Sequence, residues 1–280
     1  MIFALHGLTV RYSNIISDVR LAKQAGYDAL ELHTDKLDRY LESGLGAPYL
    51  ADVLEHHGIR ASGIDIIGAV ETQDQKVFAA ILEKTKILCE FAQGIHCDTI
   101  QLNPFSELEQ YSEREQIDLT ANNIREICQI GLEHGIRFQL EAAAWTPIHT
   151  LEQCQNLLEV VDAPNLGLVI DFWHFWAARG ATPDQIRQLD PKLIYAVHIS
   201  DGFRPEIAQP WPDETLLRDV LVGDGQIPLE EWIAAIQATG FDGCYSGEFL
   251  GHTLWEHDHL EVASEYLKRM KNLVRPMKHT

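Results

Sequence analysis

Four apolar segments of this sequence end in side chains that can bind a metal ion. FQLE ends in Glu141, LGLVID in Asp171, YAVH in His198 and CYSGE in Glu248. Each segment is short enough to be a buried strand, so each polar side chain is expected at a strand end and at least partly buried. One acid at a strand end carries little weight, because helix caps and loops use acids often. Four consecutive segments of this kind indicate one shared site.

The chemistry of these four side chains favours a divalent cation. Three carboxylates packed together repel one another and raise one another's pKa. A divalent cation removes that repulsion and keeps the carboxylates ionised. A hydrogen-bonded network without metal is the alternative, but it requires the costly burial of unpaired negative charge. Three oxygen donors and one imidazole suit Mn2+ best in our interpretation, with Mg2+, Co2+ and Zn2+ as alternatives.

Further polar and aromatic residues lie close to these positions in the sequence. His174 follows Asp171 by three residues in DFWHFW, and we favour a contact with substrate over a metal-binding or purely structural role. Trp173 flanks it and either stacks on a sugar ring or packs the loop, as does Trp145. His6 and Glu31 end the first two apolar segments. Either they line the pocket, or His6 is a core histidine and Glu31 forms a hydrogen bond to a neighbour. We therefore predict a substrate pocket around the metal.

Eight short apolar segments alternate with helix-sized segments from end to end. They are residues 2–7, 29–33, 61–68, 98–103, 138–142, 166–171, 195–200 and 244–249. Capping-box pairs begin four of the helical segments: Thr72 with Gln75, Ser112 with Glu115, Thr150 with Gln153, and Thr182 with Gln185. Glycines expected in left-handed C-terminal caps end four: Gly26, Gly58, Gly135 and Gly240. This pattern predicts repeated βα units.

Repeated βα units predict an α/β fold, a (β/α)8 TIM barrel with one domain over residues 1–280. An open doubly wound sheet is the structural alternative, but no Gly-x-Gly-x-x-Gly follows the first segment. The longest irregular segment, residues 201–225, follows the seventh strand on the face where barrel active sites lie. All four metal-binding candidates are expected on that face.

Composition limits the classes of partner. The formal net charge is -20, which argues against a nucleic-acid partner, because such proteins neutralise phosphates with Lys and Arg. Five scattered cysteines show no metal-finger spacing and fit a reducing compartment. Met1 leads directly into IFALHG, with no basic or long apolar leader, and no transmembrane stretch is evident. We therefore expect a cytoplasmic protein that binds neither nucleic acid nor membrane.

The sequence also resembles the xylose-isomerase-like barrel superfamily of sugar isomerases and epimerases. The resemblance rests on GYDALELHTDKLDRYL, NLGLVIDFWHF, VGDGQIPLEEWIAAIQATGFDG and the GEF strand. It is greatest to inosose (2-keto-myo-inositol) isomerases, then to ketose 3-epimerases. It implies metal binding by Glu141, Asp171, His198 and Glu248, and a homodimer or homotetramer. The epimerases also have a His three residues after the Asp, which matches His174.

The resemblance further implies a substrate-binding arginine after the metal-binding histidine. Arg204 matches by its distance from His198, and Arg218 matches by its place ahead of VGDG. Both remain candidates, because the segment between them is lengthened. Substrate contacts are therefore predicted for His174, Arg218, Arg204 and Trp173.

The predicted reaction is isomerisation or epimerisation of a small sugar or polyol ketone through an enediolate. Glu141 and Glu248 are the predicted catalytic residues, one removing a proton and the other returning one. A dehydratase of the inosose or 3-dehydroshikimate type is the main alternative, because it starts with the same proton abstraction. A DNA-repair nuclease is disfavoured by charge and ligand set, and a sugar-binding barrel without activity is a fourth hypothesis.

Overall fold

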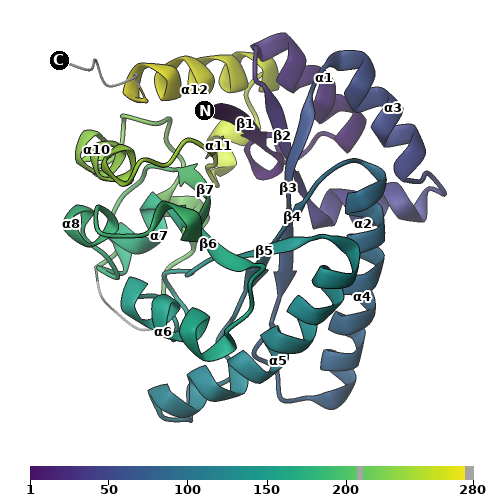
Figure 1. The fold of residues 1–280 in the computed structure, drawn as a ribbon. Helices are drawn as coiled ribbons and strands as arrows, with labels where there is room; N and C mark the ends of the chain where they lie inside the picture. The colour runs from purple at the N-terminus through teal and green to yellow at the C-terminus, as the bar shows by residue number, and fades with distance from the viewer. Residues whose placement is uncertain (207–210, 275–280) are drawn as a thin grey trace.

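Eight parallel strands form a closed barrel in the computed structural model, which describes residues 1–206 and 211–274. Each strand pairs with the next in the chain, and the last pairs with the first (Figure 1). The strands are β1 (Ile2–His6), β2 (Ala29–His33), β3 (Arg60–Gly68), β4 (Thr99–Asn103), β5 (Arg137–Leu140), β6 (Leu166–Asp171), β7 (Ile194–Ile199) and β8 (Cys244–Gly247). The predicted single TIM barrel is thus confirmed in its fold class.

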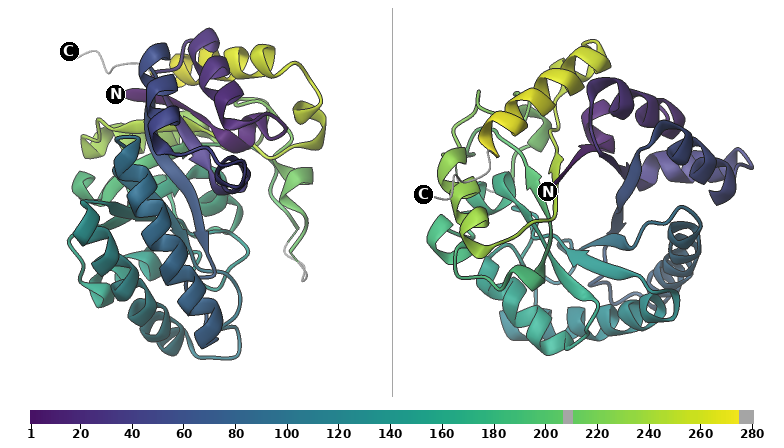
Figure 2. Two further views of the ribbon diagram at one scale, coloured as in Figure 1. Left: turned by 90° about the vertical axis from the view of Figure 1, so that its right-hand side faces the viewer. Right: turned by 45° about the horizontal axis from the view of Figure 1, so that its top comes forward.

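Helices surround the barrel, and α12 lies beside α1 so that the last helix closes the outer ring (Figure 2). The α-helices are α1 (Ile15–Ala25), α2 (Thr34–Glu42), α3 (Ala47–His57), α4 (Gln75–Gly94), α5 (Glu113–His134), α6 (Leu151–Val161), α7 (Phe172–Ala177), α8 (Pro183–Ile186), α9 (Glu214–Leu217), α10 (Leu229–Thr239), α11 (His252–Trp255) and α12 (His259–Leu273). Two 3-10 helices are η1 (Gly7–Val10) and η2 (Pro191–Leu193). In the part of the chain described, no helix has the length and apolar character that crossing a membrane requires.

Local capping chemistry sets most helix ends as predicted. The capping boxes of Ser112, Thr150 and Thr182 are confirmed. The four predicted glycine caps, listed above, all adopt left-handed backbone conformations. The prediction for Thr72 was wrong, because Asp74 caps α4 and its side chain accepts two backbone N–H groups. Thr72 instead accepts a hydrogen bond from the Asp74 backbone, which turns the chain before the helix starts.

Strand register brings the polar strand ends together. Asp171 of β6 lies opposite His198 of β7, and His6 of β1 lies opposite Glu31 of β2. Gly63 on β3 leaves room for Glu31, because a Cβ at that position would lie 3.2 Å from the Glu31 carboxylate. The apolar core fills the space between strands and helices, so these polar groups occupy the carboxyl end of the barrel.

Hydrogen bonds hold the segment between β7 and α10 in place near its start and near its end. Residues 207–210 of the predicted irregular stretch lie outside the described residues. The buried Asp201 carboxylate accepts hydrogen bonds from four backbone N–H groups, those of Gly202, Gly223, Gly225 and Ile227. Further along, the backbone of Arg218 pairs with that of Leu250 after β8. These contacts fix the position of Arg218 over the carboxyl end of the barrel.

Candidate metal centre

The four predicted metal-binding side chains converge on one point at the carboxyl end of the barrel. Glu141, Asp171, His198 and Glu248 are all buried, and one ligand atom from each lies within 4.8 Å of the others. His198 Nδ1 lies 3.4 Å from Glu141 Oε1, 3.4 Å from Glu248 Oε2 and 3.9 Å from Asp171 Oδ2. Ligands of a tetrahedral ion at about 2.0–2.2 Å are separated by roughly 3.3–3.6 Å, so the spacing fits a small cation.

Two of these atoms are buried without a hydrogen-bond partner. They are Glu141 Oε1 and His198 Nδ1, and both face the common centre. Buried polar atoms are normally paired, because an unpaired one costs the full free energy of desolvation. A cation between the two atoms would satisfy both. The donor set therefore fits a divalent metal ion.

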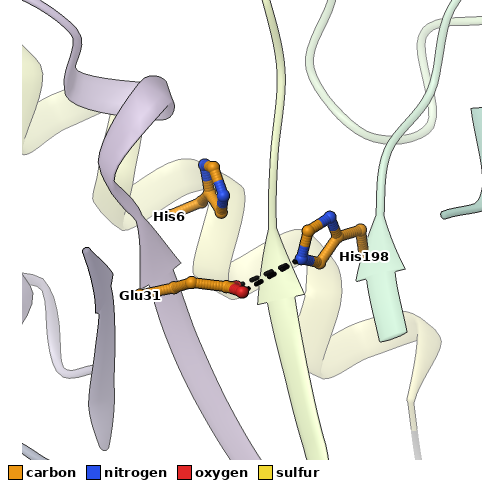
Figure 3. A group of neighbouring side chains, drawn as sticks. All are labelled: His6, Glu31 and His198. Atoms are coloured by element: carbon orange, nitrogen blue, oxygen red, sulfur yellow. Dashed lines mark hydrogen bonds and ion pairs between the residues drawn. The ribbon is translucent and has the colours of Figure 1, made fainter. Parts of the chain in front are cut away.

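Glu31 supports His198 from the side away from the centre. His198 Nε2 lies 3.2 Å and 3.3 Å from the two carboxylate oxygens of Glu31 (Figure 3). Burial acts to raise the pKa of Glu31, but the charge of His198 and its hydrogen bond lower that pKa to about 2. The ionised carboxylate holds the proton on Nε2 and leaves Nδ1 free to bind a metal. Glu31 therefore orients a ligand, whereas the sequence had suggested only a neighbour or a pocket wall.

Replacing Glu31 with Gln is expected to lower the affinity for Mn2+ or Zn2+ about 10- to 100-fold. The amide can still accept a hydrogen bond from His198, so the loss would come from the missing charge. Titration of metal into the metal-free protein against a competing chelator would measure it. Unchanged affinity would contradict the orienting role.

The carboxylates that face the centre are held by different donors. Gln101 Nε2 and Asn103 Nδ2, both from β4, donate to Glu141 Oε2 at 3.1 Å and 2.7 Å. Asp171 caps α7, and its Oδ1 accepts hydrogen bonds from the His174 backbone and the Ser200 hydroxyl. The other oxygen of each carboxylate faces the centre, Glu141 Oε1 without a hydrogen-bond partner and Asp171 Oδ2 with a hydrogen bond from Arg218. Gln101 and Asn103 could not be recognised from the sequence, because amides at strand positions are common.

Arg218 is the buried cation of the site. Its Nη2 donates to Glu248 Oε2 at 2.9 Å and to Asp171 Oδ2 at 3.2 Å, and its Nη1 lies 3.2 Å from Glu214. Burial acts to raise the pKa of Glu248, but the charges of Arg218 and His6 help to hold it well below its ordinary value. Burial dominates at Asp171, whose pKa is raised despite Arg218.

The other predicted substrate contacts are placed differently. His174 is buried, accepts a hydrogen bond from the Ala144 backbone at Nδ1, and has Nε2 3.4 Å from Arg218. Trp173 is fully buried and packs under the Arg218 guanidinium, 5.1 Å from it. Arg204 stacks on Trp176 and donates to its carbonyl. The structure thus brings His174 and Arg218 to the four ligands, whereas the contact partner of Arg204 is Trp176.

A second polar cluster lies beside the centre. His6 Nε2 lies 3.4 Å and His33 Nε2 3.7 Å from the same Asp65 oxygen. Each histidine accepts a backbone N–H at Nδ1, from Leu8 and Asp35 respectively, so the neutral ring carries its proton on Nε2. A protonated Nε2 cannot bind a metal. His6, Asp65 and Glu248 also lie close enough together to hold a cation, but this tautomer turns the protonated Nε2 of each histidine toward Asp65 instead.

The chain matches a known family over most of its length. The model of the family described as "Xylose isomerase-like TIM barrel" matches residues 19–273. The chain belongs to the xylose isomerase-like TIM barrel family. An inosose isomerase of Bacillus velezensis is 26% identical over 249 residues, which are 86% of this chain and 85% of that protein. A 3-dehydroshikimate dehydratase of Pseudomonas putida is 28% identical over 131 residues, 46% of this chain and 20% of that protein.

A solved structure shares this fold closely. It is described as the IOLI protein with a binding zinc atom, and it aligns with a TM-score of 0.89 at 24% identity over 98% of each chain. At this identity the likeness shows the fold alone. The evidence for a metal site in this chain is therefore the geometry of its own four side chains.

Proposed function

We propose that this protein is a divalent-metal-dependent isomerase or epimerase of a small sugar or polyol ketone, acting by proton transfer through an enediolate. The observation that carries the proposal is the convergence of Glu141, Asp171, His198 and Glu248 with two buried, unpaired ligand atoms. Similarity to inosose isomerases over most of the chain supports an inosose or ketose as substrate. Mn2+ is the metal we propose.

A bound cation would supply electrophilic stabilisation of negative charge on the substrate oxygens. The side chains supply the proton transfers. Both Glu141 oxygens are committed, since Oε2 accepts two amide hydrogen bonds and Oε1 faces the centre. Glu248 faces the centre with Oε2, and its Oε1 lies 3.9 Å from His6 and accepts no hydrogen bond within the described residues. We therefore assign proton removal to Glu248. Glu141 returns a proton that it takes from water at Oε1, the oxygen without a hydrogen-bond partner, and Glu248 then releases its own proton to water.

Two cationic or polar groups border the proton-transfer atoms. Arg218 and His174 lie side by side above Asp171 and Glu248, and they can hold substrate hydroxyls in place. Glu214 closes this side, because it pairs with Arg218 and accepts a hydrogen bond from Trp145. The role that we propose for Arg218 and His174 is to orient the substrate for proton transfer.

A dehydratase is the second candidate, and the similarity to 3-dehydroshikimate dehydratases favours it. The same proton abstraction is then followed by loss of a β-hydroxyl group as water. A general acid is needed for that step, and His174 is close enough to the site to serve. The two candidates differ in product: dehydration yields a conjugated enone, whereas isomerisation keeps the elements of water.

Metal-dependent turnover is the decisive test. Chelation of the purified protein is expected to abolish turnover of an inosose or ketohexose, and added Mn2+ is expected to restore it. Product NMR would identify a rearranged ketone, and ultraviolet absorbance would reveal an enone. Turnover that survives complete metal removal would contradict the proposal.

We further propose that the partner is a small neutral or charged ketone and no nucleic acid, in keeping with the net charge of -20.

A further inference from the structure

A concave pocket of about 450 Å³ opens beside the metal centre, on the same face of the barrel. It lies between η1, which follows β1, and α2, which follows β2. The residues that matter here are Arg11, His33, Lys36 and Arg39, which all line its wall. None of them takes part in the chemistry proposed above, so the pocket needs its own explanation.

Two of the cations in this pocket are unused by the protein. The side chains of Arg11 and Arg39 have no hydrogen bond or ion pair within the described residues, and Arg11 only stacks on Trp255, 5.1 Å from its ring. Lys36 differs, because its ammonium group is bonded to Asp18 at 2.7 Å and to the Val10 carbonyl at 2.8 Å. Arg11 and Arg39 are both exposed, so their guanidinium groups are open to solvent and to an anion in the pocket.

The positive charges act on one another. Burial lowers the pKa of Lys36, Asp18 opposes this, and Arg39 and Arg11 lower the pKa further. Like charges gathered in one pocket repel, and a bound anion would relieve that repulsion. Asp35 also lines the pocket, but its side chain is 61% exposed and lies 3.8 Å from His33. The pocket therefore keeps donors that the protein itself leaves free.

His33 joins this pocket to the metal centre. Its ring is 8% exposed, and its protonated Nε2 lies 3.7 Å from Asp65, beyond hydrogen-bond distance. Asp65 in turn lies 3.4 Å from His6, and His6 lies 3.9 Å from the proposed base, Glu248. Three side-chain contacts thus separate the metal ligands from the pocket wall. A group bound in the pocket would therefore lie on the same face of the barrel as the metal centre, with His33, Asp65 and His6 between them.

We propose that Arg11 and Arg39 form a binding site for an anionic group, a carboxylate or a phosphate, beside the metal centre. The anionic group is either part of the substrate or a separate small anion. The first form rests on the proposed function, since it makes the preferred substrate a ketone that carries an acid group. Guanidinium groups suit both anions, because their planar N–H donors match two oxygens at once.

The test compares charged with neutral ketones in four variants. Arg11→Gln, Arg39→Gln, the double variant and the matched control Arg114→Gln, whose side chain is 92% exposed on α5, would each be assayed. The substrates are 3-dehydroshikimate and a ketohexose phosphate against uncharged inosose and ketohexose. We expect the ratio of kcat/KM for charged over neutral substrates to fall about tenfold to a hundredfold in each pocket variant and to stay unchanged in Arg114→Gln. Calorimetric titration with inorganic phosphate is the second readout.

The outcomes separate the two sources of the anion. A lowered ratio supports an acid group on the substrate. An unchanged ratio, with phosphate binding that is lost in the double variant, supports a separate anion. An unchanged ratio and phosphate binding that does not depend on either arginine would overturn the proposal. If no ketone is turned over but phosphate binding needs both arginines, the proposed function fails while the anion site stands.

Discussion

Replacing Glu141 with Gln is expected to lower kcat by about three orders of magnitude or more while the barrel still folds. The amide preserves the shape of the side chain and can still accept hydrogen bonds from Gln101 and Asn103. It cannot offer a charged oxygen to the metal, nor can it return a proton to carbon. Loss of one acid–base group alone typically costs about 10²- to 10⁴-fold, and the weakened metal site adds to that loss. Steady-state kinetics with saturating Mn2+ would measure it.

Two further measurements define the cause of that loss. Glu71→Gln is the matched control, because Glu71 is also a buried glutamate near a strand end, and its carboxylate accepts a hydrogen bond from the Glu107 backbone instead of joining the four converging side chains. Its activity and melting temperature should stay close to those of the parent. Metal analysis of Glu141→Gln then separates the two roles, because retained metal with lost turnover would assign proton transfer to Glu141. Full activity in Glu141→Gln would refute both roles.

The sequence alone could predict the barrel and the meeting of the four side chains, because both follow from local patterns. Alternating apolar and helical segments define the βα repeat, and parallel strands of a barrel place their carboxyl ends on one face. In the structure β5 and β8 end one residue before Glu141 and Glu248, yet both side chains reach the shared centre. A shift of one residue at a strand end does not matter when the strand directs the chain to the same face.

The support for those ligands could not be predicted from the sequence. Glu31 meets His198 across the barrel, although 167 residues separate them in the chain. Gln101 and Asn103 meet Glu141 only because β4 and β5 pair in one register. Such contacts depend on barrel closure and strand register, which leave no periodicity or motif in the sequence. The same holds for Asp201, whose four hydrogen bonds to backbone N–H groups hold a distant turn.

Charge compensation explains why the site tolerates so many buried acids. Glu31 pairs with His198, and Asp171 and Glu248 share Arg218. Glu141 has two amide donors, and its ion-pair partner among the described residues is His198, 3.4 Å away. The charges of His198 and Arg218 therefore compensate Glu31, Asp171 and Glu248. The unpaired atoms Glu141 Oε1 and His198 Nδ1 lie where a cation would bind. Arg218 and the metal should thus stabilise the same carboxylates.

This shared role predicts an unusual response to replacement of Arg218 by Met. In the metal-free protein, Asp171 and Glu248 would lose their buried partner, and breaking a buried pair in this way costs about 3–5 kcal/mol of unfolding free energy. Bound Mn2+ would replace part of the missing charge. The increase in melting temperature on adding Mn2+ should therefore be larger in Arg218→Met than in the parent. Thermal unfolding with and without metal would show it.

Arg204→Met is the matched comparison, because Arg204 lies on the same segment after β7 but stacks on Trp176. Its metal-induced increase in melting temperature should equal that of the parent, and its kcat/KM should fall less than that of Arg218→Met. The pair of variants also decides which arginine holds the substrate, since the sequence left both open. An equal metal-induced increase in Arg218→Met and the parent would mean that Arg218 and the metal do not act on the same carboxylates. In that case a cation at this centre would be indicated by the unpaired atoms of Glu141 and His198 and not by Asp171 and Glu248.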